Sequence, residues 1–163
     1  MFVMLLLLIA LVMLLIQTTF LHSLTIFQMK PDFILILTVY IGLISDDLKG
    51  SMLGFFLGLL QDSFSGVGIG VNALSKGLIG LTVGYLRKTT LGYNLLTQLF
   101  VVFLATLCDG AIVLMMTDLP WRRGDDVQRF FHSLVTVAFY SALAAPFVMG
   151  ILSKTIGRFQ MVK

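Results

Sequence analysis

The chain contains 163 residues, of which 58% are hydrophobic and 12% are charged, and its formal net charge is +3. Soluble domains carry about a quarter charged residues, and so small a net charge gives no indication of nucleic-acid binding. The charges fall in a few clusters between long apolar runs, whereas the strands of a membrane barrel would alternate apolar and polar residues. This pattern is typical of a helical protein that crosses a bilayer several times, because a backbone in lipid has to satisfy its own hydrogen bonds.

The first predicted helix covers residues 2–20 and the second covers residues 31–45. The first has neither the basic start nor the small-residue cleavage site of a secretory signal peptide, so we expect it to be retained. Pro31 and Asp32 begin the second helix, with the carboxylate near the positive end of the helix dipole. Its apolar part, residues 33–44, would extend about 18 Å, less than the roughly 30 Å core of a bilayer. Either a thinned membrane or packing within the protein would accommodate so short a helix.

The third predicted helix, residues 48–64, carries a stripe of glycines. Gly50, Gly54 and Gly58 recur at four-residue spacing on one face, which allows a second helix to approach to backbone contact. Asp62 follows one turn later on nearly the same face. We expect this stripe to pack against another helix, either within the chain or on a partner.

A glycine-rich turn follows this helix. Ser65, Gly66 and Gly70 interrupt the apolar pattern, because glycine permits backbone angles that other residues resist. Two interpretations of Asp62 stay open at this point. It is an ion, proton or partner site within the membrane, or it caps the turn and fixes the end of the hairpin.

Three further helices are predicted at residues 71–86, 91–118 and 130–152. Pro146 is expected to kink the last of them, and residues 120–129 form the most polar loop. We expect one transmembrane domain over residues 1–163 with six spans, five being possible. The Lys and Arg residues other than Lys76 then divide six to four between the two sides, which favours both termini in the cytoplasm.

Two charged residues fall deep within predicted helices. These are Lys76 and Asp109. An unpaired charge at such a depth costs several kcal/mol. We therefore expect Lys76 to pair with Asp109 or with Asp62.

The sequence has no catalytic or metal-binding pattern. The GxGxxA string at residues 68–73 matches a dinucleotide fingerprint, but it lacks the preceding strand and the acidic residue about twenty positions later. His22 and His132 lie at predicted helix ends, without the spacing of a zinc site. The single cysteine, Cys108, excludes an intramolecular disulfide. We expect no enzymatic activity, no cofactor and no metal.

The order of these motifs resembles the MreD family, the small multi-pass membrane component of the bacterial rod-shape machinery. The most specific part is the stretch from Gly58 to Gly70, where the family shows G-x-x-x-D-x-x-S-G followed by a further glycine. The opening of the second helix at Pro31 and Asp32 also matches. Further matching positions are Tyr40, Asp109 and Pro146.

This resemblance implies a non-enzymatic protein of the bacterial inner membrane. Such a protein binds the bitopic membrane protein MreC, and through it the actin-like MreB, the RodA glycosyltransferase and a transpeptidase. It would act as a scaffold that holds partner helices and supports lateral peptidoglycan synthesis and cell shape. The family is also similar in architecture to the substrate-binding S components of energy-coupling-factor vitamin transporters. A small-molecule-binding transporter subunit, with a polar cavity open to the outside and an ATPase partner, is therefore the alternative.

Overall fold

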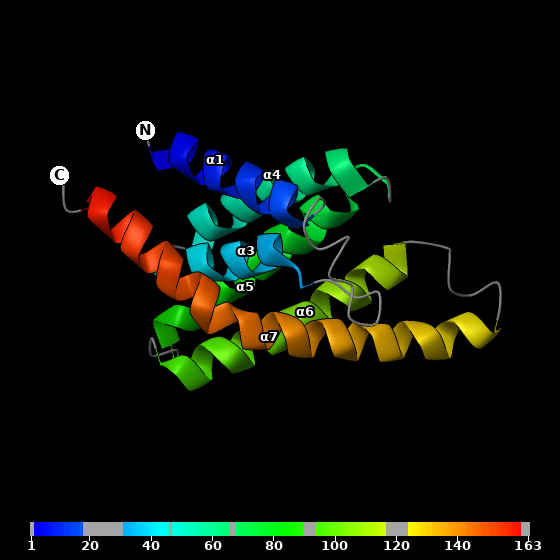
Figure 1. Ribbon diagram of the computed structural model, residues 1–163. Helices are drawn as coiled ribbons and strands as arrows, with labels where there is room; N and C mark the ends of the chain where they lie inside the picture. The colour runs from blue at the N-terminus through cyan, green and yellow to red at the C-terminus, as the bar shows by residue number, and fades with distance from the viewer. Residues whose placement is uncertain are drawn as a thin grey trace.

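The structure, a computed structural model, describes six stretches of the chain. These are residues 2–17, 31–45, 47–65, 68–89, 94–116 and 124–160. Within them the chain forms helices and no strand, which confirms the predicted all-α class. The helices are α1 (Phe2–Leu15), α3 (Phe33–Ile44), α4 (Asp47–Ser65), α5 (Val71–Thr89), α6 (Leu95–Met116) and α7 (Gly124–Gln160) (Figure 1).

Two of the described helices are long and apolar enough to cross a membrane, by length and composition. They are Leu95–Met116, which is all of α6, and Phe130–Thr155 within α7. Two more segments, Leu6–Leu15 and Phe33–Ile44, are apolar but shorter.

The last helix is longer than the sequence predicts. It begins at Gly124 instead of residue 130 and continues to Gln160, so residues 124–129 are helical and not part of a loop. Pro146 lies inside the helix. Since proline lacks the N–H group and crowds the preceding turn, a bend is expected, and Figure 1 shows α7 changing direction in its orange part.

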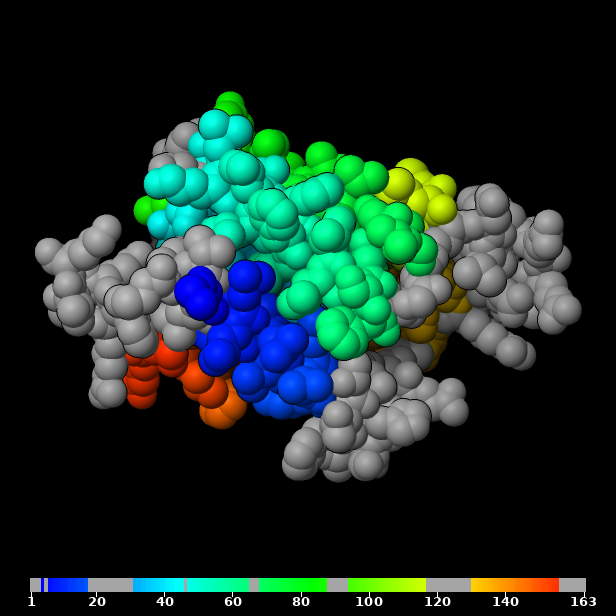
Figure 2. All heavy atoms as spheres, turned by 90° about the horizontal axis from the view of Figure 1, so that it is seen from above, coloured from blue at the N-terminus to red at the C-terminus, as the bar shows by residue number. Residues whose placement is uncertain are grey.

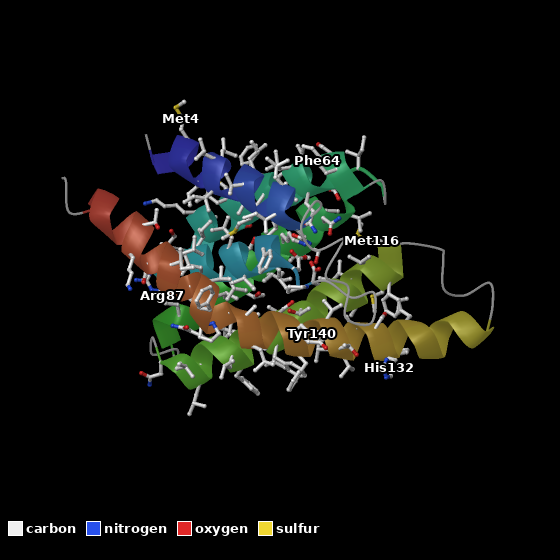
Figure 3. All side chains as sticks on the ribbon, in the orientation of Figure 1. Met4, Phe64, Arg87, Met116, His132 and Tyr140 are labelled. Atoms are coloured by element: carbon white, nitrogen blue, oxygen red, sulfur yellow. The ribbon has the colours of Figure 1, made fainter. Side chains whose placement is uncertain are left out.

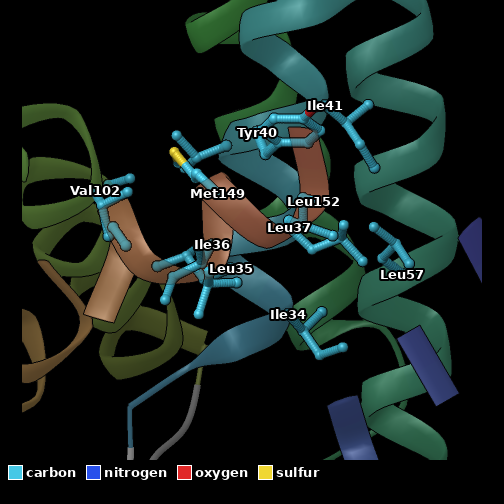
Figure 4. Close-up of a cluster of buried hydrophobic side chains, with 14 of the residues drawn as sticks. Ile34, Leu35, Ile36, Leu37, Tyr40, Ile41, Leu57, Val102, Met149 and Leu152 are labelled. Carbon is cyan, nitrogen blue, oxygen red and sulfur yellow. The ribbon is translucent and has the colours of Figure 1, made fainter. Parts of the chain in front are cut away.

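Helix α3 forms the centre of the molecule. Every residue from Ile34 to Leu43 is buried, because helices α4, α5, α6 and α7 and part of α1 surround it. Figure 4 shows Tyr40 and Ile41 of α3 among Leu57 of α4 and Leu152 of α7. A helix that contacts protein on all sides has no need to match the thickness of a bilayer, which accounts for its shortness.

Helices α4 and α5 form an antiparallel hairpin with backbones in contact. A Cβ atom added to Gly50 would lie 2.8 Å from the carbonyl oxygen of Gly80. One added to Gly54 would meet the carbonyl oxygen of Lys76, and one added to Gly58 would meet that of Asn72. The whole glycine stripe is therefore occupied by the backbone of α5.

Helix α5 contributes glycines to the same contact. A Cβ atom on Gly80 would meet the carbonyl oxygen of Gly50, and one on Gly84 would lie 2.6 Å from the Cα atom of Asp47. Gly42 of α3 approaches from the third side, since its added Cβ atom would lie 3.3 Å from the carbonyl oxygen of Gly80. Three helices thus meet at small residues, as membrane helices do when they pack closely. The predicted stripe packs within the chain and presents no free face to a partner helix.

Helix α1 lies beside α3 and α4 at the edge of the bundle. Leu6, Ala10 and Leu14 recur every four residues and are buried. An apolar groove of about 380 Å³ lies between α1, α3 and α4 and is lined by residues such as Leu7, Phe56 and Ser63. Figure 2 shows this face, with α1 in blue beside α4 in cyan to green.

Candidate functional site: a buried polar network

Asp62 stands at the end of α4 and caps the start of α5. Its Oδ2 atom accepts hydrogen bonds from the backbone N–H groups of Gly70 at 2.8 Å and Ala73 at 3.1 Å. Its Oδ1 atom accepts from the backbone N–H of Asn72 at 3.1 Å and from the Asn72 side chain at 2.8 Å. These N–H groups belong to the first turn of a helix and the turn before it, where they have no partner inside the helix. This is the geometry that the capping interpretation of Asp62 requires.

Glycine makes the turn between the two helices possible. Gly68 has φ of 134° and Gly70 has φ of 105°, a region that residues with a Cβ atom rarely adopt. Asp62 can reach the N–H group of Gly70 because the chain reverses here. Of the other predicted turn residues, Gly66 and the side chain of Ser65 lie outside the described residues.

Lys76 is the centre of the network. Its side chain is fully buried, at 0% exposure, and its Nζ atom lies 3.1 Å from Oδ2 of Asp32 and 3.4 Å from Oδ1 of Asp109. A third contact, at 3.3 Å, goes to Oδ1 of Asn72. A lysine ammonium has three N–H donors, and these three acceptors match them. Of the two expected pairs, Lys76–Asp109 is present, whereas Asp62 reaches Lys76 only through Asn72.

Asp109 brings helix α6 into the network. Its Oδ1 atom accepts a hydrogen bond of 2.5 Å from Oγ of Ser75 in addition to the contact with Lys76. The short distance is typical of a hydroxyl that donates to a charged carboxylate. Because Asp109 is itself buried, these contacts fix α6 against α5.

Asp32 serves two functions in the structure. As N-cap of α3 it accepts a hydrogen bond from the backbone N–H of Leu35 at 3.0 Å, and its Oδ2 atom binds Lys76. Oδ2 also accepts from Nε2 of Gln61 at 3.5 Å, and the backbone N–H of Asp32 donates to Oγ of Ser141 at 3.1 Å. Asp32 thereby connects α3 with α4, α5 and α7.

Sequence reasoning recognised Asp32 as the start of a helix but missed it as a partner of Lys76. It also missed Asn72 and Ser75. A signal was available, since Asn72, Ser75 and Lys76 stand at i, i+3 and i+4 and therefore share one face of a helix. Such a polar face in an apolar helix is expected to turn inward. No comparable pattern in the sequence indicates that Ser141 accepts a hydrogen bond from Asp32.

The remaining predicted positions are structural. Tyr40 is buried in the core at 3% exposure. Pro31 precedes the N-cap residue Asp32, and Pro146 lies inside α7. His132 is exposed near the start of α7.

The network offers little to a reaction. Among the described residues, no three His, Cys, Asp or Glu side chains are placed to hold a metal ion. Ser75 donates to a carboxylate, but it is fully buried, so no substrate reaches its hydroxyl. The network holds helices α3, α4, α5, α6 and α7 in one arrangement, because a buried charge is stable only when its partners stay in place.

Two of the described helices can cross a bilayer by length and composition, and the bundle pairs buried ionisable side chains in its interior. Both features are typical of membrane proteins. The profile of the rod shape-determining protein MreD matches residues 1–153. The chain belongs to the MreD family, as the order of its motifs predicts. No curated protein and no solved structure matches it significantly.

Membership of this family has two direct consequences. The chain is a membrane protein, and it has a role in determining rod shape.

The groove between α1 and α4 is apolar apart from Ser63. It is therefore not the polar cavity that the transporter alternative requires, and no observation favours that alternative.

Proposed function

We propose that this protein is a non-catalytic scaffold of the bacterial inner membrane that supports lateral peptidoglycan synthesis. Its direct partner is a bitopic protein of the MreC type, and through it the scaffold joins MreB, RodA and a transpeptidase. The observation that carries the proposal is the family match, which covers residues 1–153 of the 163-residue chain. Residues 1–163 form one transmembrane domain in this proposal, and both termini lie in the cytoplasm.

The interior of the molecule supports a role in holding other proteins and not in chemistry. Lys76 binds both Asp32 and Asp109, and Asp62 accepts hydrogen bonds from the start of α5, so these charged groups stabilise the fold. The glycine stripe supports the same role, since it joins α4 and α5 at backbone distance. We propose that these residues act by keeping the outer faces of the bundle rigid.

The partner contact lies on those outer faces in this proposal. Because α5 occupies Gly50, Gly54 and Gly58, a partner helix cannot use the stripe. The outward sides of the bundle instead carry large apolar side chains, for example Phe56 at 55% and Phe147 at 74% exposure. A rigid bundle presents such side chains at constant spacing, which lowers the entropy lost when another helix packs on them.

The experiment is purification of a tagged copy from its native membrane in mild detergent, with mass spectrometry of the proteins that accompany it. The proposal expects an MreC-type protein and wall-synthesis enzymes, in amounts that fall when Lys76 is changed. Gly150→Ala serves as the control, because nothing lies within 4 Å of its added Cβ atom and the interior stays intact. Recovery of an ATPase and a membrane coupling subunit in their place would contradict the proposal.

A further inference from the structure

The buried cluster around Lys76 has one positive and two negative side chains. The Nζ atom of Lys76 lies 3.1 Å from Asp32 and 3.4 Å from Asp109, so one ammonium group serves two carboxylates. Among the described residues, Lys76 and Asp32 are the charged side chains that act on Asp109. With both carboxylates ionised the cluster keeps one uncompensated negative charge, which is costly inside a membrane protein.

The two carboxylates differ in what stabilises their charge. Asp32 is the N-cap of α3, where the N–H of Leu35 donates to Oδ1 and the positive end of the helix dipole lies. Its Oδ2 atom also accepts from Gln61 and binds Lys76. Asp109 is buried within α6, and the described residues give it no backbone N–H donor. The carboxylate that lacks compensation is therefore Asp109.

The second oxygen atom of Asp109 is available to a ligand. Oδ1 accepts from Ser75 and Lys76, whereas Oδ2 accepts no hydrogen bond from the described residues. The side chain keeps 12% of its surface exposed. Water can therefore approach this carboxyl group although most of it is buried.

A buried amide oxygen shows that the cluster also lacks hydrogen-bond donors. The Nε2 atom of Gln61 lies 3.5 Å from Oδ2 of Asp32, and its Oε1 atom is buried without a partner among the described residues. The three N–H donors of Lys76 are already used. An acceptor buried without a donor is unfavourable. The cluster is therefore short of both positive charge and hydrogen, and a proton supplies both.

Asp109 lies nearer to one end of its helix than to the other. Met116, the last residue of α6, follows seven positions later, which corresponds to about 10 Å at 1.5 Å per residue. Figure 3 shows Met116 and Phe64 at this end of the molecule and Arg87 at the opposite end. In the orientation proposed above, with six spans and cytoplasmic termini, the fifth helix ends outside. The nearer water is then that of the outer side.

We propose that Asp109 is a proton-binding site, which takes one proton from bulk water onto Oδ2 and returns it there. Binding turns the carboxylate into a neutral carboxylic acid, and no other bond changes. Oδ1 stays an acceptor for Ser75 and Lys76 in both states. With the proton bound, Lys76 and Asp32 are the two remaining ions and the cluster is neutral. Helix α6 is therefore held most firmly when Asp109 is protonated.

The proton makes the attachment of α6 depend on pH. Helices α3, α5 and α7 pack against α6. Lys76 and Ser75 of α5 and Asp32 of the α3 cap face Asp109, and from α7 the uncharged Leu134 packs on the next residue of α6. A solvated aspartate is ionised at neutral pH, so the folded protein binds one proton more than the unfolded chain. The folding equilibrium constant should then fall up to about tenfold for each rise of one pH unit while the proton is bound.

The test is infrared difference spectroscopy of the purified full chain in an ester-free detergent, from mildly acidic to mildly alkaline pH. All eight acidic residues of the chain are aspartates, and solvated aspartates are ionised throughout this range. A carbonyl band of a carboxylic acid therefore marks a protonated buried side chain. The wild type should show one such band, which fades as the pH rises. Asp109→Asn should lack the band, and its thermal midpoint should vary less with pH than that of the wild type.

A matched pair of serine variants locates the proton. Ser75 and Ser141 are both fully buried. Ser75→Ala removes the hydrogen bond to Oδ1 of Asp109, so the carbonyl band should move to higher frequency. Ser141→Ala removes a contact with the backbone of Asp32 and should leave the band where it is. A band that Ser75→Ala does not move would place the proton on another carboxyl group.

The absence of a carboxylic-acid band in the wild type near neutral pH would overturn the proposal. A band that persists in Asp109→Asn would do the same. Exchange of sodium for potassium at constant pH should change neither the band nor the thermal midpoint. If the midpoint follows the sodium concentration instead, a metal cation balances the cluster and the proton proposal is wrong. Because no readout involves a partner protein or wall synthesis, these results leave the scaffold proposal untouched.

Discussion

At the scale of single residues, the molecule depends on a few polar side chains that satisfy one another. Asp62 accepts four hydrogen bonds from the start of α5, and Lys76 distributes three donors among two carboxylates and an amide. In a bilayer the apolar contacts between helices bring little gain over contacts with lipid. Hydrogen bonds and ion pairs, together with the close packing at the glycines, therefore decide which helices lie side by side.

Removing the cation at the centre should destabilise the protein strongly. Lys76→Met leaves Asp32 and Asp109 close together without their shared partner, and breaking a buried ion pair in this way costs about 3–5 kcal/mol. We expect a large fall in the amount of folded protein in the membrane, measured by fluorescence-detected size exclusion in mild detergent. Lys154→Met at an exposed position is the control. Equal folded yields for the two variants would show that the ion pairs contribute nothing.

Removing the cap should separate the ends of the hairpin. Asp62→Ala leaves the buried N–H groups of Asn72 and Ala73 without an acceptor, at a cost of about 1–3 kcal/mol for each unsatisfied group. Asp62→Asn retains one acceptor oxygen and should lose less. The thermal midpoints of the purified variants should rank wild type, then Asn, then Ala. A midpoint for Ala equal to that of the wild type would remove the structural role assigned to this carboxylate.

At the scale of the elements, local patterns in the sequence predict most of the helices and the glycine contact. Helices α3, α4 and α5 begin and end within a few residues of their predicted limits, because Pro31, the glycine stripe and Gly70 are local signals. The stripe alone does not say which helix covers it. That depends on Lys76, Gly80 and Gly84 of the neighbouring helix, which lie opposite the stripe only in the folded hairpin of α4 and α5.

The complete burial of α3 could not be predicted for a different reason. A helix that is apolar on every side can face lipid or protein equally well, and the sequence of α3 does not discriminate between them. The same holds for the contact of Asp32 with Lys76, since it joins residues from α3 and α5 and depends on how three helices assemble. The Lys76–Asp109 pair was predictable because the cost of a lone buried charge requires a partner.

A methyl group on the glycine stripe should disrupt the hairpin. In Gly54→Ala the new Cβ atom meets the backbone carbonyl of Lys76, which cannot move aside as a flexible side chain would. Overpacking of this kind costs about 1–3 kcal/mol. Gly150→Ala is the matched control, because nothing lies within 4 Å of its added Cβ atom and alanine favours a helix by up to about 1 kcal/mol.

The measurement is the thermal midpoint of each purified variant. Gly54→Ala should lower it, whereas Gly150→Ala should leave it unchanged or raise it. If the two variants have the same midpoint as the wild type but Gly54→Ala loses its partner protein, the stripe faces a partner, and the internal contact described above is wrong.

At the scale of the whole molecule, the network joins two groups of helices. Helices α3, α4 and α5 pack around glycines, and the α6–α7 hairpin is attached to them by Asp109 and by Ser141. These polar contacts connect the two groups, and we propose that they hold the bundle in the arrangement that supports rod shape. Charge balance, and not the presence of charge as such, should then decide whether the protein folds.

The most direct measurement is the folded amount in the membrane and the cell shape of a strain that depends on a plasmid copy of this protein. Lys76→Met should give little folded protein and rounded cells. The triple variant Lys76→Met/Asp32→Asn/Asp109→Asn removes every unpaired charge, and Asn still caps a helix well, so it should recover much of the folded protein and the rod shape. If the triple variant is as poor as the single one, or if the single variant supports normal rods, the charge-balanced network is not what holds this bundle together.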